Sequence, residues 1–221
     1  MIYEIVNSFN RVLVLVLVFI LVLSGSCAST KSVENGQEPQ EHIKIFDQGF
    51  EKALYKASLI YKKNNLSGLI LIKWFPETAS YRVVFMSEVG FNYFDYEFFK
   101  TEKNNFKVHY SVEMLKYGGF VKKVRSDFSS LLMSYPDDIE KESSINKEYG
   151  IITTRYMGIG VNSYYYRPVE ETYISRIDIK GLFYTKARIE ISEYKNSVPS
   201  KILVGHTPKN MEINLTQIDK Y

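Results

Sequence analysis

Apolar and polar residues alternate with a period of two through most of the chain after residue 50. In residues 53–61 every odd-numbered position is Ala, Tyr or Leu. This is the period of a β-strand, whose successive side chains point to opposite faces. Aromatic residues favour such strands, and the chain contains 18 Tyr and 14 Phe. Further strands are predicted at 66–74, 81–88, 91–99, 106–110, 149–156, 163–169, 172–179, 183–192, 201–206 and 211–218, which makes about eleven in all.

The spacing of these strands predicts how they connect. Short strands at intervals of roughly ten residues, with Gly, Asn, Pro or Lys between them, are typical of an antiparallel meander. Such a meander curls into a barrel or packs as a sandwich. We therefore expect a mainly β fold with a curved barrel, and a β-sandwich is the alternative. Gly68 interrupts an apolar strand and indicates a bulge or bend where the sheet curves.

Residues 120–135 are the exception to the period of two. Their apolar side chains recur at helical spacing, at Val121, Val124, Phe128, Leu131, Leu132 and Tyr135. The polar face is expected to consist of Lys122, Lys123, Arg125, Ser126 and Asp127. Two glycines precede the segment and Pro136 stops it. We expect a helix of about four turns against the concave face of the sheet. It is either a plug of ordinary core or a lid over a cavity, and the candidate lid residues are Val124, Phe128, Leu131 and Leu132.

The N-terminal part of the chain has a different pattern. An apolar run, 12–23, stands directly before Ser24–Cys27, and Cys27 is the only cysteine. A short apolar run, small residues and then a thiol are typical of a lipoprotein signal. The run is shorter than the roughly 20 apolar residues that cross a bilayer. We expect 1–26 to be a signal peptide and Cys27 to be lipidated. The alternatives are a signal that releases a soluble protein and an uncleaved anchor.

Composition divides the rest of the chain. Residues 27–41 are rich in Ser, Glu, Gln, Gly and Pro, and Val33 is their one large apolar side chain. Such a segment buries too little surface to offset the entropy of ordering. We therefore expect 27–41 to be a lipidated N-terminus and a flexible tether. Residues 42–221 are long enough to bury a sizeable core, and a single β-rich domain is expected there.

Charge and motifs exclude several classes of function. The chain has 28 Lys and Arg against 25 Asp and Glu, which gives no reason to expect nucleic acid as a partner. It contains no HExxH, GxSxG or P-loop motif. We therefore expect no enzyme, no catalytic residue and no metal. No cofactor is expected apart from a covalent lipid on Cys27.

Four weaker features each have a functional and a structural interpretation. Asp95 and Glu97 lie two apart on one predicted strand, as a glycosidase pair could, but outward-facing charges on strands are commoner. Tyr164 and Tyr166 share one strand face and could form a binding wall. An acidic cluster without EF-hand spacing is expected to be a solvated loop: Asp137, Asp138, Glu140 and Glu142. The cations Lys122, Lys123 and Arg125 could contact lipid headgroups, or they form a solvated helix face. The three histidines, His42, His109 and His206, are far apart in sequence.

The whole arrangement resembles the LolA/LolB superfamily. The resemblance rests on a cysteine placed for lipidation, a short tether, a β-meander with an inserted helix, and the segment LSGLILIK at 66–73. It implies a half-open β-barrel with a helical lid, which carries or accepts acyl chains or lipoproteins in the periplasm. It also implies a membrane-facing loop, 87–91, with Val89 and Phe91 as the candidates.

The same resemblance implies the location of the protein. Cys27 would carry diacylglyceryl and an amide-linked acyl chain such as palmitate, in the manner of lipoproteins of diderm bacteria. Position 28 is Ala rather than the Asp that retains lipoproteins in the inner membrane. The outer membrane is therefore expected, on either its periplasmic or its surface side.

Two functional hypotheses follow. The first is a non-covalent carrier or acceptor of acyl chains or lipoproteins, whose concave face is lined by apolar side chains. The second is a structural or interaction lipoprotein with a solid core, which binds an envelope protein partner. In both cases Cys27 holds the protein at membrane lipids.

Overall fold

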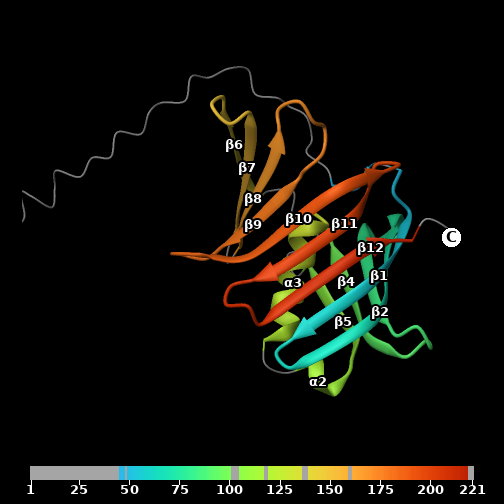
Figure 1. Ribbon diagram of the computed structural model, residues 1–221. Helices are drawn as coiled ribbons and strands as arrows, with labels where there is room; N and C mark the ends of the chain where they lie inside the picture. Colours follow the sequence, from blue (N-terminus) through green and yellow to red (C-terminus); the bar gives the residue numbers. More distant parts are fainter. Residues whose placement is uncertain are drawn as a thin grey trace, which may run out of the picture. The chain divides into compact units, whose positions relative to one another are not determined.

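The structure is a computed structural model that describes residues 45–47, 49–100, 105–116, 119–135, 139–158 and 161–218. These residues belong to one compact unit and form a single curved sheet with helices on its concave side (Figure 1). The strands are β1 (Lys52–Tyr61), β2 (Asn64–Phe75), β3 (Ser80–Met86), β4 (Asn92–Phe99), β5 (Phe106–Ser111), β6 (Glu140–Asn146), β7 (Ile151–Gly158), β8 (Val161–Pro168), β9 (Arg176–Lys180), β10 (Thr185–Lys195), β11 (Val198–His206) and β12 (Met211–Gln217). The helices are α2 (Glu113–Lys116) and α3 (Phe120–Leu131), and a 3-10 turn covers Pro76–Thr78.

The strand order places the first and last strands together in the middle of the sheet. β1 pairs with β12, β2 to β5 continue to one edge, and β11 to β6 continue to the other. Every neighbouring pair is antiparallel. The edge strands β5 and β6 are connected through α2 and α3 across the concave side (Figure 1). Since β5 and β6 are not paired with each other, the sheet is an open half-barrel.

This architecture confirms the predicted mainly β fold, a curved antiparallel meander with one inserted helix. The twelve strands form one sheet, rather than the two sheets of a β-sandwich. The predicted number of strands was one too low, because residues 140–146 (EKESSIN) show no alternation of apolar side chains. All but one of these residues are exposed, and charged residues on an edge strand protect it from pairing with another chain.

Gly68 does not mark the predicted bulge. Its pairing with Ala57 of β1 continues without a shift in register, and the pairing of β2 with β3 begins next to it, at Leu69 and Met86. A Cβ atom at this position would instead lie 2.0 Å from the carbonyl oxygen of Met86, at the end of β3. Gly68 therefore allows the close approach of two backbones, which is another reason for glycine inside a strand.

The helix α3 ends earlier than the sequence indicated. The N–H of Met133 donates to the carbonyl of Ser130 (3.3 Å), and the N–H of Ser134 donates to the carbonyl of Ser129 (2.9 Å). Met133 has a φ of 49°. This is the Schellman arrangement, in which a residue with left-handed backbone follows the helix and turns the chain away. The helix therefore ends at Leu131, before the proline that was expected to stop it.

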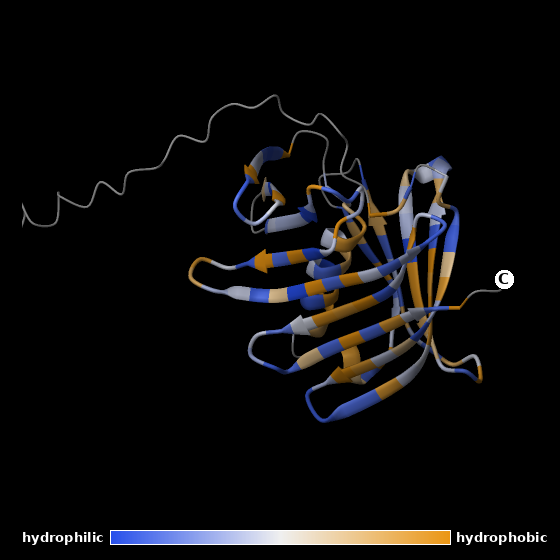
Figure 2. Ribbon diagram, turned by 45° about the horizontal axis from the view of Figure 1, so that its top comes forward, coloured by the Kyte–Doolittle hydropathy of each residue, from blue (hydrophilic) through white to orange (hydrophobic). Residues whose placement is uncertain are grey.

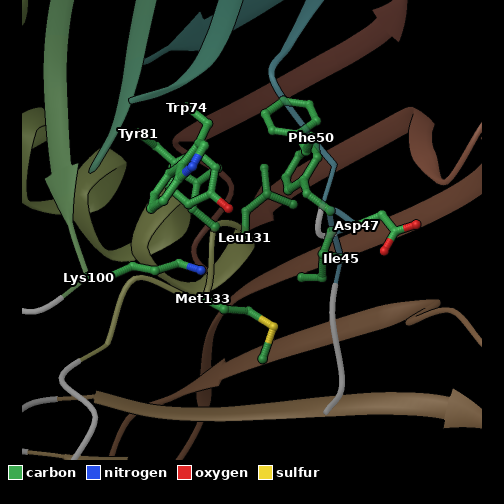
Figure 3. A pocket seen from close by; sticks show the side chains of 10 residues that line it. Ile45, Asp47, Phe50, Trp74, Tyr81, Lys100, Leu131 and Met133 are labelled. Carbon is green, nitrogen blue, oxygen red and sulfur yellow. The ribbon is translucent and has the colours of Figure 1, made fainter. Parts of the chain in front are cut away.

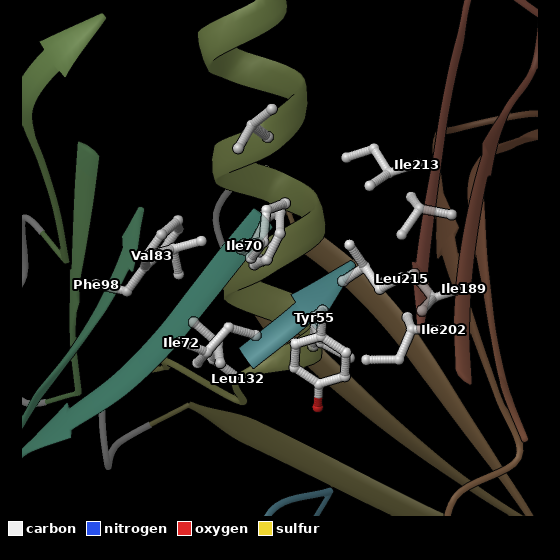
Figure 4. Close-up of a cluster of buried hydrophobic side chains, with 14 of the residues drawn as sticks. Tyr55, Ile70, Ile72, Val83, Phe98, Leu132, Ile189, Ile202, Ile213 and Leu215 are labelled. Atoms are coloured by element: carbon white, nitrogen blue, oxygen red, sulfur yellow. The ribbon is translucent and has the colours of Figure 1, made fainter. Parts of the chain in front are cut away.

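The core fills the concave side of the sheet. Buried residues alternate with polar ones along the strands (Figure 2). Figure 4 shows how side chains from both halves of the sheet surround α3: Tyr55, Ile70, Ile72, Val83 and Phe98 from β1 to β4, and Ile189, Ile202, Ile213 and Leu215 from β10 to β12. Because these side chains pack with those of α3, the helix is an integral part of the core.

Candidate functional site

A pocket of about 220 Å³ lies at the C-terminal end of α3. Three parts of the chain build its wall: the segment before β1, the strand ends around β2, β3 and β4, and the end of the helix (Figure 3). The lining residues are Ile45, Phe46, Asp47, Phe50, Trp74, Tyr81, Lys100, Leu131, Leu132 and Met133. The pocket is thus mostly aliphatic and aromatic, with one cationic and one anionic side chain.

Aromatic rings form most of the wall. The ring centroids of Trp74 and Tyr81 are 4.6 Å apart, those of Phe50 and Tyr81 are 6.2 Å apart, and those of Phe46 and Phe50 are 4.5 Å apart. Leu131 lies between the Trp74–Tyr81 pair and Phe50 (Figure 3). Burial raises the pKa of Tyr81 to about 12, so its hydroxyl stays neutral at physiological pH. The aromatic part of the wall therefore contributes uncharged rings.

The charged side chains enter the pocket from opposite sides. The Nζ atom of Lys100 lies 5.2 Å from the ring centroid of Trp74 and 5.5 Å from that of Tyr81, within the range of cation–π attraction. Asp47 lies on the other side, with its carboxylate pointing away from Lys100 (Figure 3). An apolar group with a negatively charged end would therefore find apolar walls and a cation in one place.

Met133 closes the helix end of the pocket with a strained backbone. Its left-handed φ of 49° belongs to the position after a helix that glycine usually occupies, and such a conformation costs a side chain about 1–2 kcal/mol. Met133 is half-buried and packs against the edge of the core. Its thioether belongs to a flexible side chain that adapts to irregular apolar surfaces, which suits the wall of a pocket.

A buried hydroxyl network fixes the C-terminal end of α3 to β8. The hydroxyl of Tyr165 donates to the carbonyl of Ser130 at 2.7 Å and lies 2.9 Å from the hydroxyl of Tyr135. The hydroxyls of Ser130 and Ser163 are 2.9 Å apart. Burial raises the pKa of both tyrosines, so they stay protonated. Because buried polar groups are costly to separate from their partners, the pocket wall formed by the helix end is held in place.

A second buried network fixes α3 to β11 and to the turn that follows it. Nε2 of His206 lies 2.8 Å from Oδ2 of Asp127. Nζ of Lys123 lies 3.2 Å from Nδ1 of His206 and donates to Oδ1 of Asn210 at 2.7 Å. Burial raises the pKa of Asp127 and lowers that of Lys123. Asp127 was expected on the polar face of the helix. This expectation was wrong, because the side chain faces the core and is 1% exposed.

The four predicted lid residues separate into two pairs. Val124 and Phe128 are 0% and 1% exposed and lie within the core rather than in the pocket wall. Leu131 and Leu132 do line the pocket. A cavity therefore lies at the end of the helix, while the residues beneath its middle are packed.

The predicted membrane-facing residues lie in an exposed turn. Val89 and Phe91 are 92% and 54% exposed, between β3 and β4. The N–H of Phe91 donates to the side chain of Ser87 at 2.9 Å, which shapes the turn. Cys27 and the tether 27–41 lie outside the described residues, as do His42, Asp137 and Asp138.

The two carboxylates weighed as a glycosidase pair are held by cross-strand partners. Asp95 accepts two hydrogen bonds from Arg82, at 2.7 and 2.6 Å. Glu97 accepts one from Ser80 at 2.7 Å, and its other oxygen lies 2.8 Å from Nε2 of His109. All four carboxylate oxygens thus have a partner, in the pattern of opposite charges and hydrogen bonds that stabilises neighbouring strands.

The predicted tyrosine wall, acidic cluster and helix cations lie in separate parts of the structure. Tyr165 is buried, and Tyr164 and Tyr166 lie on the opposite face, each with a cation over its ring: Lys180 at 3.8 Å and Arg176 at 3.9 Å from the centroids. Glu140 and Glu142 are exposed on β6, and Lys122 is exposed on α3. Nη2 of Arg125 donates to Oδ1 of Asn105 at 2.9 Å.

Most of the pocket was not predicted from sequence. Trp74, Tyr81, Lys100 and the residues 45–50 come from four separate places in the chain, and nothing in the local pattern relates them. Trp74 is the only tryptophan and comes just before a proline at a strand end, which is the one local signal that could have drawn attention to it.

Two further observations concern the described part of the chain. Within it, no helix combines the length and the apolar composition that a membrane crossing needs. The same residues contain no group of three or more His, Cys, Asp or Glu side chains placed to hold a metal ion.

Comparison with known proteins gives a distant likeness in structure. No protein-family model matches the chain, and no curated protein sequence matches it. A DUF1329 family protein from Desulfovibrio piger is similar at a TM-score of 0.46, with 8% identity over 78% of this chain and 85% of the other. A proposed outer membrane lipoprotein-sorting protein domain from Vibrio parahaemolyticus is similar at a TM-score of 0.49, with 8% identity over 78% of this chain and 86% of the other. Likeness of this degree does not bear on what this protein binds.

Proposed function

We propose that this domain binds an acyl chain, or an apolar group of similar width, non-covalently in the pocket at the end of α3. The observation that carries the proposal is the composition of the wall, eight apolar or aromatic side chains with Lys100 at one side. Ligand sites are typically apolar clefts with few polar groups, which orient the ligand. Lys100 supplies such a group for a carboxylate or a phosphate.

The size of the pocket limits what it takes. At about 220 Å³, it is smaller than the roughly 300–1,000 Å³ of sites that enclose a whole drug-sized ligand. One chain, or the end of one chain, is therefore a better match than a complete diacyl lipid. The rest of such a ligand would remain outside, at the charged side chains.

The proposed setting is the outer membrane, with the domain anchored through lipid on Cys27. The support for this setting is the apolar run before Ser24–Cys27 and the alanine at position 28. A domain tethered beside a bilayer meets acyl chains at high local concentration, which gives a small apolar pocket a use there.

A second candidate function rests on a different observation. Two buried polar networks fix α3 to β8 and to β11, and the residues beneath the middle of the helix are packed. A rigid, filled half-barrel of this kind suits an interaction module that binds an envelope protein. In that case the pocket is an imperfection in the packing and takes no ligand.

Native mass spectrometry distinguishes these functions. The full chain, purified with envelope lipids in mild detergent, is expected to carry one acyl ligand. Leu131→Phe, which adds volume between the rings of the wall, is expected to remove the ligand without unfolding the domain. Leu69→Phe, on the half-buried outer face of β2, is the matched control and should retain it. A chain free of ligand under all conditions would exclude acyl binding and favour the interaction module.

A further inference from the structure

The turn between β9 and β10 exposes three consecutive apolar side chains. Leu182, Phe183 and Tyr184 are 86%, 89% and 56% exposed. The N–H of Gly181 donates to the carbonyl of Tyr184 at 2.8 Å, which closes the turn and leaves Leu182 and Phe183 at its corners. Figure 2 shows the apolar turn at the end of this long hairpin, projecting beyond the neighbouring strands. The strand predicted at 183–192 included Phe183 and Tyr184. In the structure β10 begins only at Thr185, so both residues belong to the turn.

Local chemistry does not account for this turn. Neither Leu182 nor Phe183 has a positive φ, so the backbone of the turn accepts most residue types and does not select large apolar ones. In this position Leu182 and Phe183 bury almost none of their apolar surface. Exposed apolar side chains that lie together without a compensating contact in the fold are often explained by function.

Lysines lie on the apolar turn's hairpin and on the turns at the same end of the strands. Hydrogen bonds tie neighbouring turns to it and to each other: Thr207 N–H donates to the carbonyl of Lys186, and Lys62 N–H donates to the carbonyl of Asn210, both at 2.9 Å. Lys123 of α3 bonds to the same Asn210 at 2.7 Å. These segments, 61–65, 119–123, 180–186 and 206–211, are called the lysine rim. Its exposed or half-exposed cations are Lys62, Lys63, Lys122, Lys180, Lys186 and Lys209. Lys123 is held in the network with His206 and Asn210.

The charge of the lysine rim is not balanced within it. Its four segments contain no Asp or Glu. The nearest acidic residues outside them include Asp127 and Asp178, which are buried, and Asp178 is paired with Arg188 at 2.8 Å. Further acidic residues are Glu88, Glu113 and Glu212, and Glu113 is paired with Lys116 at 3.1 Å. Because the strands are antiparallel, the turns after β2, β6, β8 and β10 lie at the opposite end of the strands. Those turns include the carboxylates Glu77, Glu148, Glu170 and Glu171, and Lys147 stands beside Glu148, so the two signs are mixed there.

We propose that the β9–β10 turn and the lysine rim form a second, non-covalent contact with a bilayer that contains anionic lipid. Leu182 and Phe183 enter the acyl region, Tyr184 lies at the headgroup level, where its ring and hydroxyl suit the two environments, and the lysines bind headgroup phosphates. Clustered lysines near a membrane surface are attracted to anionic lipids. A protein partner is less well matched, because lysine is depleted at the centre of protein interfaces.

This contact orients the domain. The helix α3 runs from the lysine rim, where Lys122 and Lys123 lie in its first turn, to the pocket at Leu131. A domain held at the bilayer by the rim therefore has its pocket at the end of α3 that is farther from that bilayer. The exposed Val89 and Phe91 lie in the turn after β3, at the same end of the strands as the rim.

Quenching by brominated lipids tests the contact in the full chain. In a Trp74→Phe background, Phe183→Trp places the only indole at the turn, and Tyr149→Trp places it in the exposed turn between β6 and β7, at the other end of the strands. The chains are reconstituted into vesicles of brominated phosphatidylcholine, with or without phosphatidylglycerol. We expect strong quenching for Phe183→Trp in the anionic vesicles, weaker quenching in the neutral ones, and none for Tyr149→Trp.

Charge reversal provides the second arm. Lys180→Glu with Lys186→Glu should lower the quenching of the Phe183→Trp indole to the level of the Tyr149→Trp control. Lys52→Glu with Lys147→Glu, at the opposite end of the strands, should leave it unchanged. An environment-sensitive dye on Leu182→Cys, in a chain that keeps Trp74, repeats the test without the background change. No quenching and no dye response in anionic vesicles would overturn the proposal, and a response only to an added protein would assign the turn to a protein partner. Neither result depends on ligand in the pocket.

Discussion

The carboxylate of Asp127 on α3 lies 2.8 Å from Nε2 of His206 on β11, and both side chains are buried. The second oxygen of Asp127, Oδ1, is buried without a hydrogen-bond partner. This buried pair is one of the polar contacts that join the helix to the sheet inside an apolar core. Such a contact fixes geometry more than it adds stability, because taking polar groups out of water offsets most of the gain.

Removal of one partner of this pair should be costly. His206→Ala leaves the Asp127 carboxylate buried without its bond, and we expect the free energy of unfolding to fall by roughly 3–5 kcal/mol. Adding Asp127→Asn to that variant removes the charge and should recover part of the loss. Urea unfolding measures both. His109→Ala, in the more exposed pair with Glu97, is the control and should cost less than about 1 kcal/mol. Purely additive effects of His206→Ala and Asp127→Asn would contradict the coupling.

The pH dependence of stability should change in opposite directions at two carboxylates. Burial raises the pKa of Asp127. The contribution of this residue to the free energy of unfolding is therefore fully present below the unfolded pKa, about 3.9, and is lost as pH rises through the folded pKa. For Glu97, burial raises the pKa, but hydrogen bonds from Ser80 and His109 outweigh it and hold the pKa below its ordinary value. Its contribution is present above the unfolded pKa and is lost as pH falls through the folded pKa.

Urea unfolding across a pH series tests these signs. Relative to the unchanged protein, Asp127→Asn should gain stability as pH rises from about 4, and Glu97→Gln should gain stability as pH falls below about 4. The same trend in both variants would show that one of the two environments is wrongly assigned.

Gly68 should not tolerate a side chain. A Cβ atom would lie 2.0 Å from the carbonyl oxygen of Met86, so Gly68→Ala has to push β3 away from β2. We expect a loss of roughly 1–3 kcal/mol or more, seen as a lower melting temperature in circular dichroism. Gly205→Ala is the matched control, because nothing lies within 4 Å of the added atom. Equal stability of the two variants would contradict this packing of β2 on β3.

Lipidation at Cys27 is the prediction on which the proposed location of the protein at the outer membrane depends. Cells fed an alkyne-labelled palmitate should incorporate it into the full chain, and Cys27→Ser should abolish the label because the chain has no other thiol. Fractionation should place the labelled chain in the outer membrane. Label that persists in Cys27→Ser would contradict the predicted anchor.

The sequence predicted the fold better than the site, for a physical reason. Alternation in strands such as β1 records which face is buried, so the strands, their antiparallel connection and the inserted helix were all foreseeable. β6 was missed because its edge position needs no apolar face. Burial of Asp127 was missed because its partner, His206, is 79 residues away.

The pocket depended on contacts that no local pattern encodes. Trp74, Lys100 and Leu131 come from different elements, and only the closure of the sheet around α3 brings them together. The helical spacing did identify Leu131 and Leu132, because residues near the end of an apolar stripe face the same interior as those at its middle. The spacing alone did not distinguish the helix residues that are packed in the core from those that line the pocket.

Trp74 offers the most direct test of acyl binding, because it is the only tryptophan and forms part of the pocket wall. Titration of the full chain with a brominated fatty acid, below its micelle concentration, should quench Trp74 fluorescence with saturation. Lys100→Glu should weaken the binding, and Lys201→Glu, on the exposed face of β11, should not. Emission that stays unchanged by the brominated chain in the folded protein would contradict the account and show that the pocket admits no acyl chain.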